Sequence, residues 1–383
     1  MLRKIRLTCG IICLTLITLL FLDFTGTLHG WFGWLAKIQF LPAVLALNVG
    51  VVVLLIILTG VFGRIYCSVI CPLGVFQDVA AWIGKKRKKL PYSYSPALSL
   101  LRYGALAIFI ITLVAGVSFI ATLFAPYSAY GRIANNLFQP IWLWGNNLFA
   151  HLAERAGSYA FYEVDIWIKS LPTFIVAAAT FVILILLAWR NGRTYCNTIC
   201  PVGTVLGFLS RYSLFRITID TEKCNKCGLC ARHCKAACIN AKEHTIDYSR
   251  CVVCMDCLGK CKQKALSYQL RTTKARPAKA EENAHAASSK EVNEARRNFL
   301  TVTAMAATAS ALKAQEKKVD GGLAAIEDKK IPNRQTPITP PGSLSARNMA
   351  AHCTACQLCV SACSNQVLRP STNLMNLMQP EIS

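Results

Sequence analysis

Four long apolar runs, separated by polar segments, dominate the first half of the chain. They lie at about 7–24, 41–62, 101–123 and 171–189. A helix that crosses a bilayer needs about 20 mostly apolar residues, so the pattern predicts four transmembrane helices. The first run has a second interpretation as a signal peptide, but no small-residue cleavage site follows it.

The positions of lysine and arginine predict how these helices are oriented. Basic residues concentrate before the first run, in the loop 63–96 and directly after the fourth run. The loop 25–40 has one lysine, and basic and acidic residues balance in the loop 124–170. Because positively charged loops stay on the cytoplasmic side, both ends of the four-helix unit are expected to face the cytoplasm of a bacterial inner membrane.

The pattern GRxYCxxxCPxG occurs twice, at 63–74 and at 192–203, each time directly after the second apolar run of a pair. An internal repeat of this kind predicts that the membrane unit, residues 1–215, consists of two pseudo-equivalent helical hairpins. Proline disfavours helical geometry in the residue before it, so Cys71 and Cys200 are expected at a break. The prolines that follow them are well placed to open a short helix.

Two such loops brought together would present four sulfurs at the cytoplasmic edge of the membrane: Cys67, Cys71, Cys196 and Cys200. Basic neighbours and a helix N-terminus lower the pKa of a thiol, so we expect thiolate character here. A metal or iron–sulfur site suits four sulfurs, and so does a pair of redox-active disulfides. A packing motif in which small cysteines merely fit is the remaining alternative.

The chain has 19 cysteines and a formal net charge of +23. An odd number cannot pair completely into internal disulfides, and three runs of the form CxxCxxCxxxC are typical of metal frameworks. The basic residues flank the apolar runs and the cysteine clusters. No nucleic-acid-binding motif accompanies them, so nucleic acid is not expected as a partner.

Residues 216–270 contain two of the three runs, CNKCGLCARHC and CVVCMDCLGKC, flanked by short extended segments. They resemble a bacterial two-cluster ferredoxin domain of the α+β class, although lysine replaces the usual proline after each run. The resemblance implies two [4Fe–4S] clusters, with the fourth cysteine of each run crossing to the other cluster. It assigns one cluster to Cys224, Cys227, Cys230 and Cys261, and the other to Cys251, Cys254, Cys257 and Cys234. We interpret the additional thiol, Cys238, as core packing.

The rest of the chain is expected to alternate between linkers and short motifs. Residues 271–295 and 316–350 have the composition of linkers, and 296–315 resembles a twin-arginine export signal. Residues 351–383 contain a third run, Cys353, Cys356, Cys359 and Cys363. We interpret them as a partial ferredoxin module of a truncated gene product, because neither another cysteine nor a closing element follows. If the export signal is used, residues after about 315 are expected in the periplasm.

The membrane helices, the two CxxxCP loops and the double ferredoxin together resemble the NapH/NosR family of membrane polyferredoxins, over about residues 1–270. The tail resembles the exported ferredoxin NapG of the same family. The resemblance implies electron transfer between the quinol pool and a periplasmic reductase. The protein would then be a quinol dehydrogenase-type electron-transfer subunit. Its expected partners are quinol or quinone, redox proteins and membrane lipid. A copper reductase or assembly factor, and a membrane redox sensor, stay open as alternatives.

Overall fold

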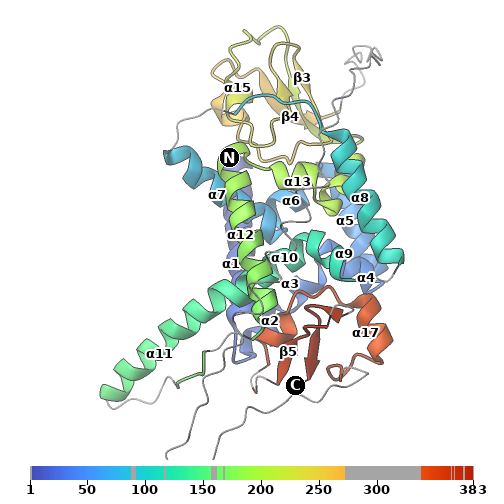
Figure 1. The fold of residues 1–383 in the computed structure, drawn as a ribbon. Coiled ribbons are helices and arrows are strands. Elements are labelled where there is room, and N and C mark those ends of the chain that lie inside the picture. The colour runs from blue at the N-terminus through green and yellow to red at the C-terminus, as the bar shows by residue number, and fades with distance from the viewer. Residues whose placement is uncertain are drawn as a thin grey trace, which may run out of the picture. The chain divides into compact units, whose positions relative to one another are not determined.

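The computed structural model describes residues 2–87, 92–115, 118–156, 162–166, 169–271, 338–363, 365, 367–373 and 376–382. The described residues belong to one compact unit, which comprises Met1–Arg271 and Gln335–Ser383. Figure 1 shows the described elements of this unit. The predicted linker from 272 onward, the twin-arginine segment 296–315 and the start of the next linker lie outside the described residues.

Two helices of this unit are long and apolar enough to cross a membrane: α1 (Leu2–Leu22) and α12 (Leu171–Asn191), each with 21 residues. Both keep large apolar side chains on the outside of the fold, such as Ile12 on α1 and Leu186 on α12. An apolar surface of this length suits contact with lipid hydrocarbon. Their positions agree with the first and fourth apolar runs.

The second and third apolar runs are not continuous helices, contrary to the sequence prediction. Residues 41–62 divide into α4 (Phe40–Leu45) and α5 (Val49–Phe62), because the Asn48 side chain caps a new helix at the Val51 N–H. Residues 101–123 divide into α8 (Ser99–Val114) and α9 (Ser118–Phe124). At 1.5 Å per residue, α5 and α8 are about 21 and 24 Å long, shorter than a hydrocarbon core of about 30 Å.

Further helical segments lie between α1 and α12 in the sequence. They are α2 (Thr27–Phe32), α3 (Trp34–Lys37), α10 (Pro126–Ile133), the π-helix η1 (Ala134–Phe138) and α11 (Gln139–Arg155). Every residue of α10 is buried. Tyr130 of α10 packs against Phe21 with ring centroids 6.4 Å apart, which fixes α10 against α1.

The two CxxxCP loops form matching pairs of short helices. The first loop consists of α6 (Ile65–Val69) and α7 (Pro72–Arg87), and the second of α13 (Thr194–Thr198) and α14 (Pro201–Ser210). Cys200 is extended, with φ −66° and ψ 117°, and Pro201 opens α14. The predicted break before each proline is therefore confirmed.

Residues 216–270, which contain the first two cysteine runs and are called the double-run segment below, fold as two small antiparallel sheets with short helical turns. β1 (Phe215–Ile219) pairs with β4 (Leu266–Leu270), and β2 (Ile239–Asn240) pairs with β3 (Thr245–Ile246). The turns are α15 (Leu229–Arg232) and the 3-10 helix η2 (Leu258–Lys260). Phe215 of β1 stacks on Phe62 at the end of α5, which joins this segment to the membrane helices.

The C-terminal segment has α17 (Ala346–His352) and α18 (Leu358–Ser361), followed by β5 (Leu368–Pro370) and β6 (Pro380–Ile382). The two strands pair antiparallel, with Leu368 opposite Ile382. The expectation that no closing element follows the third cysteine run is therefore wrong. β5 ends at a proline and β6 begins at one, and each strand has only three residues. Strands this short carry too little periodicity to be recognised in a sequence.

Candidate iron–sulfur sites

All three cysteine runs adopt the same backbone conformation. The residue before the second cysteine has positive φ in each: Lys226 at 57°, Val253 at 50° and Ala355 at 48°. The residue after the second cysteine does so as well: Gly228 at 71°, Met255 at 60° and Gln357 at 63°. A short helical turn follows each time.

Positive φ is costly for a side chain branched at Cβ, so Val253 is a genuine outlier. Such conformations persist where the surroundings over-determine them, and they concentrate at functional sites. The third run therefore shares these two positive-φ positions with the first two runs. In that run the Ala355 N–H donates to the Cys353 sulfur at 3.4 Å, a contact that stabilises a thiolate.

The structure gathers the cysteines of the double-run segment around two cavities. Cys224, Cys227, Cys230 and Cys261 line one of them. Cys234, Cys251, Cys254 and Cys257 line the other. Each cavity thus combines three cysteines of one run with the fourth cysteine of the other, which is the crossed arrangement implied by the ferredoxin resemblance.

Cys238 also lines the second cavity, where the sequence reading assigned it to core packing. Its sulfur lies 3.5 Å from the Cys234 sulfur, and its side chain is 1% exposed. The residue is therefore both buried, as expected, and in contact with a predicted cluster ligand. Cys238 lies outside the CxxCxxCxxxC run, so the ferredoxin pattern did not predict its place at the cavity.

The four CxxxCP cysteines are brought together in the membrane unit, and each is 4% exposed. Two buried arginines join the loops reciprocally. Arg64 of the first loop donates to the Cys196 carbonyl at 3.1 Å, and Arg193 of the second donates to the Cys67 carbonyl at 2.7 Å. The Gly203 N–H donates to the Cys200 sulfur at 3.3 Å. The sequence identified both arginines as part of the repeat but not their crossing.

For Cys71, Cys196 and Cys200 the expected lowering of the thiol pKa is not found. Burial raises the pKa of Cys196 to about 11, and it also raises the pKa of Cys71 and Cys200. The sequence prediction weighed the basic neighbours but not desolvation, which disfavours the charged form. Binding of a cationic metal or cluster would displace these protons.

An ion network connects this four-cysteine site to the double-run segment. Asp78 of α7 accepts a hydrogen bond from Arg193 Nε at 2.8 Å and another from Arg6, and Lys235 lies 3.6 Å away. Burial opposes ionisation, but the cations outweigh it and hold the pKa of Asp78 well below its usual range. Arg64 also donates to the Ser249 carbonyl at 3.0 Å, two residues before Cys251.

The third run lies against the segment that begins with α10. Ser128 donates to the Thr354 carbonyl. The side-chain amides of Asn135 and Asn136 both donate to the Gln357 side-chain oxygen, at 3.1 and 3.0 Å. Because three residues of α10 and η1 each bond to the cysteine loop, that loop is held in place by the membrane unit.

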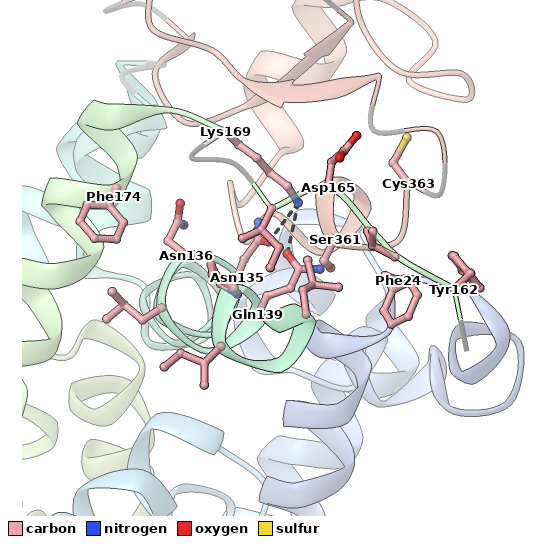
Figure 2. A pocket seen from close by; sticks show the side chains of 16 residues that line it. Phe24, Asn135, Asn136, Gln139, Tyr162, Asp165, Lys169, Phe174, Ser361 and Cys363 are labelled. Atoms are coloured by element: carbon pink, nitrogen blue, oxygen red, sulfur yellow. Dashed lines mark hydrogen bonds between the residues drawn. The ribbon is translucent and has the colours of Figure 1, made fainter. Parts of the chain in front are cut away.

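A cavity of about 420 Å³ opens beside this contact, lined by Asp165, Lys169 and Cys363 among others. Figure 2 shows the Lys169 side chain reaching toward Asn135 and Gln139, to which it donates at 3.4 and 3.2 Å. Burial lowers the pKa of Lys169 to about 8. Lys169 also donates to the Val360 carbonyl at 3.4 Å, so it contacts the third run directly.

Among the described residues, no three cysteine, histidine or acidic side chains converge on a position for one metal ion. The thiolates of a single tetrahedral zinc stand about 3.8 Å apart, as the Zn–S distance requires. Cysteines spread around a cavity suit a larger, multi-atom group.

A family model described as a 4Fe-4S binding domain matches the chain twice, at residues 44–91 and 173–220. Each match contains one CxxxCP loop, and the second begins 129 positions after the first, as Cys196 does after Cys67. The model thus matches the repeated membrane segments rather than the double-run segment. It places the four-cysteine site within an iron–sulfur domain family.

Three relatives are similar over half of the chain or more. The methylamine utilization ferredoxin-type protein MauN of Methylobacillus flagellatus is 27% identical over 215 residues, covering 54% of this chain and 62% of MauN. The ferredoxin-type protein NapH of Haemophilus influenzae is 26% identical, covering 60% of this chain and 70% of NapH. The regulatory protein NosR of Stutzerimonas stutzeri is 25% identical, covering 51% of this chain and 23% of NosR. No solved structure matches the chain.

The repeated 4Fe-4S domain and these relatives define a ferredoxin-type iron–sulfur protein. Within that class, the chain is similar to NapH and NosR. The identities are low, and the chain spans less than two thirds of MauN and of NosR. Two apolar helices and a NapH-like relationship are consistent with an inner membrane protein.

Proposed function

We propose that the protein transfers electrons between membrane quinol and a redox partner protein. This partner belongs to a periplasmic reductase system. One observation carries the proposal: one hydrophobic core contains cysteines of the CxxxCP site, of the second cysteine set of 224–261 and of the third run. The four CxxxCP cysteines and Cys254 are members of this core, and Cys356 of the third run packs against it. Packed side chains therefore connect these three sites without an intervening solvent layer.

The residues present fit iron–sulfur clusters. The crossed sets of 224–261 would hold two [4Fe–4S] clusters, and the CxxxCP and 353–363 cysteines offer four thiols each. Bound clusters would supply reversible one-electron exchange. The chain itself contributes thiol ligands, N–H donors to sulfur, and a buried environment that excludes water.

The two ends of α12 support a transmembrane arrangement. At its C-terminal end, the Arg193 N–H donates to the Lys235 carbonyl of the double-run segment at 2.9 Å. Just before its N-terminal end, Lys169 contacts the third run. In Figure 1 the double-run strands and β5 accordingly lie at opposite ends of α12. If α12 spans the bilayer, the two cysteine segments lie on opposite sides, with 216–270 cytoplasmic by the basic-residue rule.

Quinol oxidation releases two electrons and two protons, and quinol-driven reduction is therefore the test. The full chain is purified anaerobically, titrated by EPR, and compared with a variant carrying serine at Cys67, Cys71, Cys196 and Cys200. We expect quinol to reduce the wild-type clusters, and the variant to lose this reduction while dithionite still reduces the 224–261 clusters.

Normal quinol-driven reduction in the serine variant, with every cluster retained, would show that the CxxxCP cysteines are neither ligands nor relays. Stoichiometric reduction of copper without quinol oxidation would replace the proposal by a metal reductase. Redox-dependent partner binding without turnover of any donor would replace it by a sensor.

A further inference from the structure

Arg132 is a fully buried cation that has no carboxylate partner among the described residues. Its side chain is 0% exposed, and one terminal nitrogen donates to the Thr122 carbonyl at 3.1 Å. Its Nε and its other terminal nitrogen have no hydrogen-bond partner in the described part of the chain. Arg193 is equally buried but contacts Asp78 at 2.8 Å. An unpaired buried charge is costly, so Arg132 requires a negative group that the protein alone does not supply.

Lys169 is a second cation of the same kind. It donates to neutral oxygens of Asn135, Gln139 and Val360, and none of the ion pairs among described residues includes it. Asp165 lines the same cavity but is exposed and lies outside ion-pair distance. Figure 2 shows Lys169 and Cys363 at the rim of this cavity.

Both cations are close to cysteines of the third run. Arg132 interacts electrostatically with Cys356, and Lys169 with Cys363 and Cys359. The contact is tight at the backbone, since a Cβ added to Gly131 would lie 2.4 Å from the Cys356 carbonyl oxygen. An oxidised [4Fe–4S] cluster with four thiolates carries a net charge of roughly −2. Two unpaired cations match that charge.

We propose that Arg132 and Lys169 are the counter-charges of an iron–sulfur cluster held by Cys353, Cys356, Cys359 and Cys363. This inference rests on the proposed function, because it requires the third run to hold a cluster. The membrane unit thereby sets the reduction potential of a cluster whose ligands all come from another part of the chain. Reduction adds one electron to a group that is already negative, so each nearby positive charge favours it.

The test is an EPR-monitored redox titration of the full, anaerobically purified chain. The third-run signal is identified as the one lost in Cys356→Ser, which should also remove about four irons per chain. At the wild-type midpoint potential, Arg132→Gln and Lys169→Gln should each lower the ratio of reduced to oxidised third-run cluster about tenfold. A tenfold change corresponds to a shift of about 59 mV for one electron. Arg132→Lys keeps the charge and should restore most of the ratio.

Arg102→Gln is the matched control, because Arg102 is also a buried arginine but donates to Ser249 in the double-run segment. It should leave the third-run potential unchanged. If Arg132→Gln does not fold, the partly exposed Lys169 still allows the measurement. An unchanged third-run potential in the glutamine variants, or an equal shift of all clusters, would overturn the proposal.

Failure of this inference and failure of the proposed function have different signatures. If Cys356→Ser keeps its full iron content while quinol still reduces the 224–261 clusters, only the counter-charge inference is contradicted. Absence of quinol-driven reduction removes the proposed function, whereas the potential shift can still be measured with dithionite and supports the inference.

Discussion

Arg64 and Arg193 occupy equivalent positions in the two CxxxCP loops, and each bonds to the opposite loop. Arg64 reaches the Cys196 carbonyl at 3.1 Å, and Arg193 reaches the Cys67 carbonyl at 2.7 Å. Neither loop can therefore take its observed position without the other. The exchange explains why both arginines are fully buried.

The glycine that ends each CPxG sequence, Gly74 or Gly203, leaves space for the arginine of the opposite loop. A Cβ at Gly203 would lie 2.3 Å from the Cys196 carbonyl oxygen and 2.8 Å from an Arg64 nitrogen. We expect Gly203→Ala to destabilise the protein by about 1–3 kcal/mol, the usual cost of overpacking. Gly60→Ala is the control, because no atom lies within 4 Å of its added Cβ. Thermal unfolding in detergent measures both, and equal midpoints would contradict the prediction.

Asp78 neutralises the cations that link the four-cysteine site to the double-run segment. Asp78→Asn leaves Arg193 buried without a carboxylate, and we expect a loss of about 3–5 kcal/mol of stability. Asp220→Asn removes an exposed pair with Lys223 and should have no measurable effect. Denaturant unfolding of the two variants separates the cases. Similar stability of both variants would show that the buried network contributes little.

The same carboxylate predicts a pH dependence. The pKa of Asp78 in the folded protein lies below its value of about 4 in the unfolded chain. Its contribution is therefore complete above about pH 4 and is lost as the pH falls toward the folded value. The stability difference between wild type and Asp78→Asn should stay constant from about pH 7 to 5 and shrink in more acid solution. A difference that persists undiminished at about pH 2 would contradict this assignment.

Cys238 and Cys234 lie side by side, and the ferredoxin pattern assigns the ligand role to Cys234. We expect Cys234→Ser to lose iron, whereas Cys238→Ala should retain it. The second variant should lower the potential of that cluster, because it removes a thiol that can donate to a ligand sulfur. Iron analysis and an EPR titration measure the two effects. The reverse pattern of iron loss would make Cys238 the ligand.

The transmembrane arrangement predicts where the C-terminus lies. If Arg296 and Arg297 direct export, protease added to spheroplasts should digest a C-terminal epitope on the wild-type protein. Replacing both arginines by lysine should keep that epitope in the cytoplasm and protect it from the protease. A tag within 216–270 serves as the cytoplasmic control. Protection of the wild-type C-terminal epitope would place the third run in the cytoplasm.

Local sequence was sufficient for much of this protein. Apolar length identified α1 and α12, and proline placed the break at Cys200. The apolar pattern did not reveal that the runs at 41–62 and 101–123 are divided, because hydropathy does not register a helix cap such as Asn48. Nor did it give the protonation of the CxxxCP thiols, since burial is a property of the whole fold.

The sequence by itself determined which residues carry the chemistry, because cysteine spacing and proline positions act over a few residues. The tertiary structure decided which sites adjoin one another. It crossed Arg64 and Arg193, put Cys238 beside Cys234, and set Arg132 and Lys169 against the third run. These relationships join residues up to 224 positions apart, as Arg132 and Cys356 are, and depend on packing and the desolvation of charge.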